Sequence, residues 1–341
     1  MGLQRNILLK TLLWVVTATF LLPGCAIAPY IQIDVLAPAT IAFPSTVNRL
    51  GVLDRTAYNT PDTTLADHAG DKTFLPIHIE VKEISKPCVN GLLSALQNSP
   101  RFEFTQLPEE VLNVNDMSSN LSQQEWQQLE EICRDSLVDA LVVLKYVDYY
   151  DYISIYLNEE GEKSKYYSII FKSAWRIYDP SEQIIINDYK HTDTTTYIVG
   201  DEFYNYNFLP DADRAAQLQE VAWHSGNDYG HRIAPQWMEV NRKYYVWPSD
   251  ASTQASEDVS LNKWDEAAAI WRTETASKKR NRASQACFNM ALASEIMDKY
   301  DLALYWAQKS QELKPRYSTA QYIDILKERV KTKAILDKQM E

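Results

Sequence analysis

The sequence predicts an α+β domain, a mixed sheet with packed helices, followed by an all-α helical domain. Three observations lead to this fold class. Runs of alternating or continuous apolar residues between positions 30 and 200 predict strands. Segments with apolar residues at helical spacing interrupt these strands. From residue 263 onward only helical patterns occur, and they repeat with a period of 36 residues.

The strands of the first domain are expected to form a sheet around one central strand. Residues 141–147 read LVVLKYV, the most continuously apolar segment, and such segments are typical of a strand buried on both faces. Later strands are joined by short turns at Gly161 and Pro180, so they pair antiparallel. The expected strands span residues 30–36, 47–53, 102–107, 141–147, 149–157, 166–178, 183–192 and 243–247.

Helices are expected to cover this sheet. Pro87 fits the first turn of one helix, where its missing N–H is not needed, and Ser122 offers an N-cap for another. Gly226 and Gly230 lie inside a third helix, where each glycine costs ~1 kcal/mol relative to alanine. Their presence indicates close packing of the backbone against the sheet. The expected helices span residues 84–97, 122–137 and 211–233.

The N-terminus has the pattern of an export signal. Arg5 and Lys10 precede an apolar run, 11–22, that is too short to span a bilayer, which requires ~20 residues. Leu22-Pro23-Gly24-Cys25 resembles a bacterial lipobox, although Pro23 replaces the usual small residue. The resemblance implies lipidation of Cys25, and its two or three acyl chains give stable anchoring. The alternative is an ordinary buried cysteine after a plain secretory signal.

Four segments follow from these patterns: a signal peptide at 1–24, an α+β envelope domain at 25–247, a linker at 248–262 and helical repeats at 263–341. The linker is assigned because its sequence, rich in Ser, Asp and Ala, offers little to bury.

Charge and cysteine content exclude several functions. Without residues 1–24 the chain carries 32 basic and 46 acidic side chains, a balance that disfavours nucleic acid and adhesion to anionic lipid through a basic patch. Cys88, Cys133 and Cys287 show no metal-ligand spacing and are expected in apolar cores, with a contact between Cys88 and Cys133 as the alternative.

The helical part contains an internal repeat. A shift of 36 residues places Trp264-Asp265-Glu266-Ala267 on Tyr300-Asp301-Leu302-Ala303. This pattern resembles tetratricopeptide repeats, whose period is 34. One unit is nearly complete at 284–315, whereas 263–276 resembles half a repeat and 317–336 a capping helix. A plain bundle of helical hairpins is the alternative.

The repeat resemblance implies a short curved solenoid whose concave side binds an extended peptide or a helix. The positions that would face this groove are Gln285, Phe288, Leu292 and Glu295. Packing of the same face against the first domain is the alternative.

Motifs of catalysis are missing from the sequence: there is no P-loop, GxGxxG, GxSxG or HExxH. His224 and His231, about two helical turns apart, are weighed as a metal or acid/base pair against surface or packing histidines. We therefore expect no enzyme, no cofactor and no metal. The tyrosines of residues 146–156 (YVDYYDYISIY) leave glycan binding as an alternative function.

The lipobox, the segment Val35-Leu36-Ala37-Pro38-Ala39, the tyrosine-rich strands and the terminal repeats together resemble a Bacteroidetes-type family of lipoproteins with an uncharacterised N-terminal domain. The resemblance implies a layout and no activity. The expected function is a lipid-anchored adaptor of a Gram-negative envelope, on the outer membrane and facing the periplasm, with another envelope protein as partner.

Overall fold

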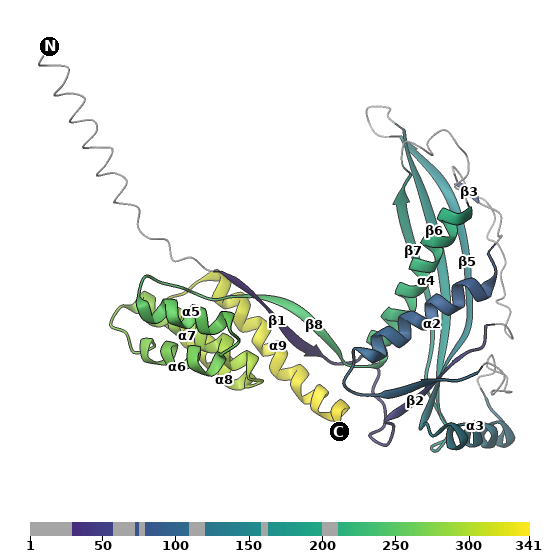
Figure 1. Cartoon of the computed structure of the whole chain (residues 1–341), viewed down its shortest axis with the longest axis horizontal. Helices are drawn as coiled ribbons and strands as arrows, with labels where there is room; N and C mark the ends of the chain where they lie inside the picture. The colour runs from purple at the N-terminus through teal and green to yellow at the C-terminus, as the bar shows by residue number, and fades with distance from the viewer. Residues whose placement is uncertain (1–28, 57–71, 75–78, 109–119, 158–162, 200–210) are drawn as a thin grey trace, which may run out of the picture. The chain divides into compact units, whose positions relative to one another are not determined.

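The computed structural model describes residues 29–56, 72–74, 79–108, 120–157, 163–199 and 211–341 (Figure 1). The contacts between its residues divide the chain into two compact units. The sheet unit comprises Leu36–Trp237 and Ile335–Glu341, and the helical unit comprises residues up to Val35 with Met238–Ala334. The predicted fold class is confirmed, since a mixed sheet with helices precedes a region of several helices. The expected signal peptide with Cys25, and the turn at Gly161, lie outside the described residues.

The sheet unit is built on one long strand. β5 (Ala140–Leu157) lies in the middle of the strand order β4-β2-β5-β6-β7 and is parallel to β2 but antiparallel to β6. The expected central strand is therefore confirmed. Two strands were expected within these residues, but a register shift between Leu144 and Tyr146 bends the strand without ending its pairing. The other strands are β2 (Arg49–Asp54), β3 (Lys72–Phe74), β4 (Glu103–Gln106), β6 (Lys163–Asp179) and β7 (Ile184–Ile198).

Two helices, α2 (Val81–Gln97) and α4 (Asp211–Ile233), cover one face of this sheet (Figure 1). They cross closely, because a Cβ on Gly226 would lie 1.7 Å from the carbonyl oxygen of Cys88. The glycines of α4 thus permit contact with α2, and not with the sheet as expected. α2 also begins one turn earlier than expected, so Pro87 lies inside the helix.

The third helix of this unit, α3 (Gln123–Ser136), packs on the opposite face of the sheet. Ser122 caps it as expected, in a reciprocal capping box with Glu125. Cys88 and Cys133 belong to the clusters on opposite faces, so they do not meet. All three described cysteines are free and buried.

A two-stranded ribbon pairs β1 (Tyr30–Ala37) with β8 (Gln236–Lys243), and the helical unit contains residues up to Val35 and from Met238 of these strands. The last strand was expected at residues 243–247. Lys243 instead ends β8, and residues 244–247 belong to no strand, because their backbone groups bind the side chains of Asn289 and Ser252.

Five helices follow the ribbon, and consecutive helices of the first four pack on one another. Residues 248–262, expected to be a linker, contain α5, which Ser249 caps and which buries Ala255 and Val259. The helices are α5 (Asp250–Ser260), α6 (Trp264–Glu274), α7 (Arg280–Ile296), α8 (Tyr300–Leu313) and α9 (Tyr317–Met340).

The period of 36 residues is visible in the backbone. Asn262 and Asp298, 36 positions apart, both adopt positive φ, at 59° and 55°. The amide of Lys263 donates to Asp258 O, and the amide of Lys299 donates to the equivalent Ser294 O. α5–α6 and α7–α8 are therefore two equivalent helical hairpins, and α5 completes the unit that was expected to be half a repeat.

Candidate partner-binding site

The inner face of α7 carries the four side chains that the repeat resemblance assigned to a groove. Gln285, Phe288, Leu292 and Glu295 are all buried, with exposed fractions of 6% or less. Residues 244–247 and α9 cover this face, through ring contacts of Phe288 with Tyr245 and Tyr322. Whether the face binds a partner protein stays a prediction, but its centre is occupied by the chain's own extended segment.

Asn289 holds that extended segment by its backbone. Its Oδ1 accepts from the amide of Tyr245 at 2.7 Å, and its Nδ2 donates to the Tyr245 carbonyl oxygen at 2.8 Å. Two residues on, the amide of Trp247 donates to Ser252 Oγ at 3.0 Å. Sequence reasoning missed Asn289. The available signal was an amide side chain directly after Phe288 and one helical turn from Gln285, within a helix that is buried along most of its length.

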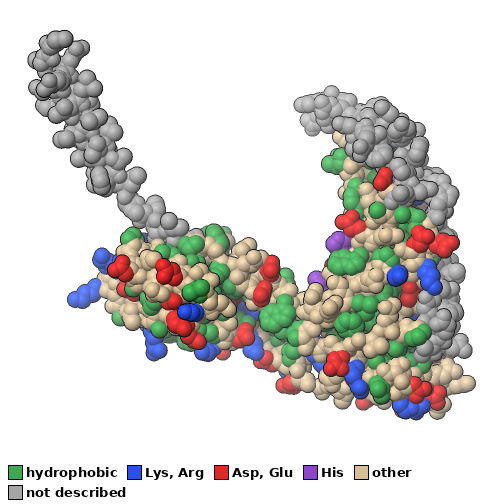
Figure 2. All heavy atoms as spheres, in the orientation of Figure 1, with side chains coloured by type: hydrophobic (Ala, Val, Ile, Leu, Met, Phe, Trp, Pro, Cys, Tyr) green, Lys and Arg blue, Asp and Glu red, His purple; other side chains and the backbone are tan. Residues whose placement is uncertain are grey.

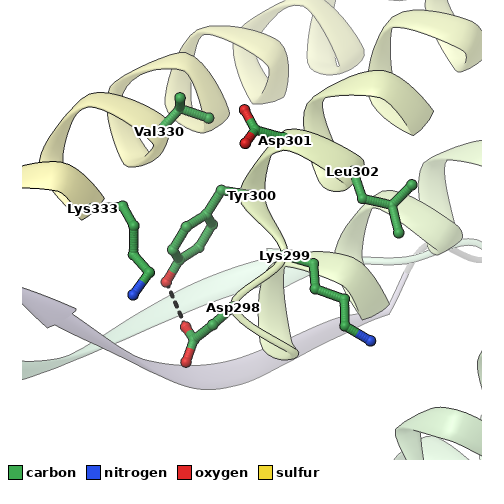
Figure 3. A pocket seen from close by; sticks show the side chains of 7 residues that line it. All are labelled: Asp298, Lys299, Tyr300, Asp301, Leu302, Val330 and Lys333. Carbon is green, nitrogen blue, oxygen red and sulfur yellow. Dashed lines mark hydrogen bonds between the residues drawn. The ribbon is translucent and has the colours of Figure 1, made fainter. Parts of the chain in front are cut away.

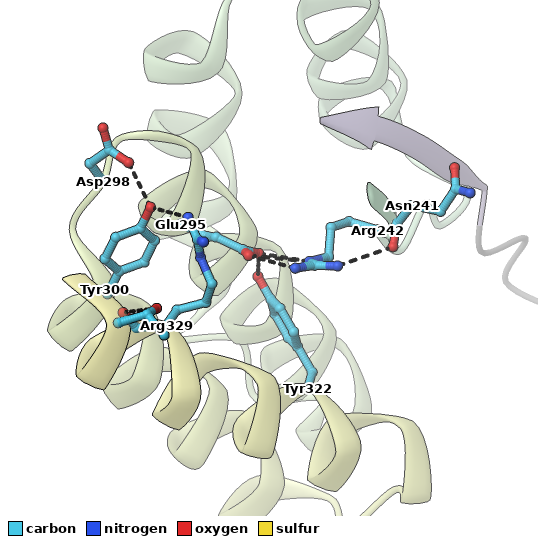
Figure 4. A network of polar contacts seen from close by, with 8 residues as sticks. Asn241, Arg242, Glu295, Asp298, Tyr300, Tyr322 and Arg329 are labelled. Carbon is cyan, nitrogen blue, oxygen red and sulfur yellow. Dashed lines mark hydrogen bonds and ion pairs between the residues drawn. The ribbon is translucent and has the colours of Figure 1, made fainter. Parts of the chain in front are cut away.

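Glu295 is the acceptor of a buried polar network (Figure 4). Arg242 donates to its carboxylate at 2.8 and 3.0 Å, and the hydroxyl of Tyr322 donates at 2.6 Å. Burial alone would lower the pKa of Arg242, but the hydrogen bonds and charge of Glu295 raise it overall. Burial and the same carboxylate raise the pKa of Tyr322 well above its usual value. The charge of Glu295 is thus matched inside the protein.

A pocket of about 200 Å³, here named the ribbon pocket, opens beside this network. Phe288 and Ile325 line it with apolar groups, and Asn241, Arg242 and Lys243 of β8 line it with polar groups. The lining residues are Tyr30, Asn241, Arg242, Lys243, Phe288, Ser318, Gln321, Tyr322 and Ile325.

A second pocket of about 350 Å³ lies between the start of α8 and α9 (Figure 3). Its central side chain is Tyr300, whose hydroxyl donates to Asp298 at 2.7 Å and accepts from Arg329 at 2.6 Å. Burial and the bond to Asp298 raise the pKa of Tyr300 to about 12. The phenol therefore stays protonated near neutral pH and acts as a fixed hydrogen-bond link. The lining residues are Asp298, Lys299, Tyr300, Asp301, Leu302, Val330 and Lys333.

The other candidate residues are dispersed over the sheet unit. His224 is exposed and lies 4.0 Å from Glu220, and His231 is exposed as well. No group of three or more metal-ligating side chains occurs within the described residues. In the tyrosine-rich run, Tyr149 and Tyr152 are buried and Tyr156 is exposed. His224 and His231 therefore belong to no metal-ligating group among the described residues, and two of the tyrosines considered for glycan stacking are covered.

Comparison with known families adds two matches. A family model described as a domain of unknown function (DUF8603) matches residues 47–245, and a second one (DUF6340) matches residues 253–328. No curated protein matches the chain. Within the described ranges, no helix has the length and apolarity that crossing a membrane requires.

Proposed function

We propose that this chain, which belongs to the DUF8603 family of unknown function, is a lipid-anchored adaptor of a Gram-negative envelope. In this proposal the helical unit binds another envelope protein, and the lipid on Cys25 holds the complex at the outer membrane, facing the periplasm.

One observation carries the binding part of the proposal. Asn289 makes two hydrogen bonds to the backbone of a single extended residue, Tyr245. Bonds to backbone amide and carbonyl groups suit any extended polypeptide, whatever its side chains. The inner face of the repeats thus already performs the contact that a peptide-binding adaptor requires, with the chain's own segment as occupant.

The short stretch of chain between Cys25 and the ribbon supports the proposed anchoring at the membrane. Four residues lie between Cys25 and Tyr30, the first residue of β1, so five Cα-to-Cα steps join them. Because an extended chain spans at most ~3.6 Å per residue, the start of the ribbon lies within roughly 18 Å of a lipidated Cys25. An anchor at Cys25 therefore keeps the ribbon pocket, which Tyr30 lines, close to the membrane surface.

The experiment is crosslinking in intact cells, followed by purification of the tagged lipoprotein and mass spectrometry. We expect a defined envelope protein in the wild-type sample and its loss with Cys25→Ala. An unchanged protein set in the Cys25→Ala sample would contradict membrane-localised binding. An empty set from the wild type would contradict the adaptor function.

A further inference from the structure

We infer that the ribbon pocket binds a large apolar side chain of the partner protein that stands next to an acidic residue in an extended segment. This inference rests on the proposed adaptor function and specifies the chemistry of the partner. Three features of the pocket carry it: its size, its apolar walls and an uncompensated positive charge.

The size of the pocket selects a single side chain. Sites for whole drug-sized ligands enclose ~300–1,000 Å³. The ribbon pocket encloses about 200 Å³, which is below that range. A pocket of this size accommodates one large residue of a polypeptide whose main chain remains outside.

Four of the nine residues that line the pocket, Tyr30, Phe288, Tyr322 and Ile325, carry aromatic or aliphatic side chains. Phe288 and Tyr322 are buried in its floor, with their ring centroids 5.0 Å apart. Tyr30 and Ile325 stand on the rim with exposed fractions of 72% and 41%. Covering these two side chains with an apolar partner removes their surface from water, which favours binding.

The positive charge of Lys243 beside the pocket favours an acidic residue in the partner segment. Arg242 is neutralised by Glu295, as described above. The Nζ of Lys243 lies 5.3 Å from the ring centroid of Tyr245 and 5.6 Å from that of Phe288, and it forms no ion pair with any described residue. Arg316 lies 5.3 Å from the centroid of the same Tyr245 ring, and its side chain donates to the neutral groups Ser284 Oγ and Asn281 Oδ1.

Lys243 and Arg316 thus place two cations beside one aromatic ring, in a chain of net charge −12. On the face drawn in Figure 2, acidic side chains lie among basic and hydrophobic ones over the helical unit. Complementary charge fixes the register of a bound segment and raises its association rate. An acidic residue beside the anchoring side chain would therefore pair with Lys243 at the mouth of the pocket.

The test uses the full lipid-anchored chain, solubilised in detergent and immobilised through a C-terminal tag. A phage library of random heptapeptides is selected on the wild type, on Lys243→Met and on the control Lys299→Met. Lys299 is a suitable control because it belongs to the same unit and forms no ion pair with described residues.

We expect the wild type and the control to enrich peptides with a large apolar residue next to Asp or Glu. The Lys243→Met variant should bind the best such peptide about two- to fivefold more weakly, the upper part of the range for one exposed ion pair. Ile325→Asp, a substitution at an exposed site, should abolish binding while circular dichroism stays unchanged. Peptides without acidic residues, equal affinity for Lys243→Met, or no enrichment would each overturn the inference.

The cellular crosslinking separates this inference from the proposed function. If Lys243→Met and Ile325→Asp recover the same partner as the wild type, the adaptor function stands and the pocket assignment is wrong. Binding of the wild type to phosphatidylglycerol vesicles that Lys243→Met abolishes, without peptide enrichment, would assign the pocket to lipid and overturn the inference as well.

Discussion

Substitution of Asn289 by alanine should release the extended segment from the inner face of α7. Asn289 is fully buried and Tyr245 is 7% exposed, so the Tyr245 amide and carbonyl lose partners that water does not readily replace. Each unsatisfied buried group costs ~1–3 kcal/mol. The lower end of the two costs together is ~2 kcal/mol, which corresponds to a roughly 30-fold larger population of the opened segment.

Hydrogen exchange measured by mass spectrometry reports this opening directly. Peptides covering residues 244–247 should exchange roughly 30-fold faster in Asn289→Ala, whereas peptides from α8 should change much less. Ser294→Ala is the matched control on the same helix, because the Ser294 hydroxyl bonds only to the carbonyl of Met290 within α7. Less than threefold acceleration in Asn289→Ala would refute the idea that these two bonds hold the segment.

Three further predictions concern the sheet unit and the thiols. Gly226→Ala should lower the free energy of unfolding in urea by ~1–3 kcal/mol, because the new methyl group meets backbone atoms of α2. Gly51→Ala should cost less, because its methyl group would meet only the ends of side chains. Equal losses in the two variants would contradict the close contact between α4 and α2. Asp151→Ala should lower the free energy of unfolding by ~3–5 kcal/mol, since it removes the buried carboxylate that pairs with Arg214 and accepts from the Tyr167 hydroxyl; a change below ~1 kcal/mol would contradict this. Burial raises the pKa of Cys133 to about 12 and that of the helical unit's thiol, Cys287, to about 11, so both should resist iodoacetamide at pH 8 until the chain is unfolded. Because the folded state holds these thiol protons more tightly than the unfolded state, the contribution of the two thiols to stability should decline as pH rises above about 9. Similar alkylation rates before and after unfolding would refute the burial of the thiols.

The elements of the sheet unit were largely predictable because they depend on local patterns. The apolar run at 141–147 identified the central strand, and Ser122 identified the start of α3. The partner of the α4 glycines was not predictable. A glycine indicates that something approaches closely, but the sequence does not say whether a sheet or the backbone of α2 is the neighbour.

The helical unit shows a different limit. α5 has few apolar residues, and it was missed because its composition resembles a linker. The repeat itself contained the missing information: the same shift of 36 residues places Ala255 on Ala291, a buried position of α7. Continuing the comparison toward the N-terminus would have identified the first hairpin as complete.

The role of the four α7 residues in binding a partner stays a prediction, and the structure adds what covers them. The four α7 residues do share one face, as their spacing indicates. The periodicity of a helix cannot show what covers that face, and here residues 244–247 come from a segment that was assigned to the other domain. Asn289 escaped prediction for the same reason, since its role depends on a backbone far away in sequence.

Site-specific photocrosslinking in intact cells tests the adaptor account most directly. A benzophenone amino acid replaces Gln321, which lines the ribbon pocket, or Lys327, which is exposed on the same helix but outside the pocket. The account predicts one protein adduct at position 321, its absence at position 327, and its loss when Lys243→Met is added. The same adducts at both positions, or none at position 321, would contradict it.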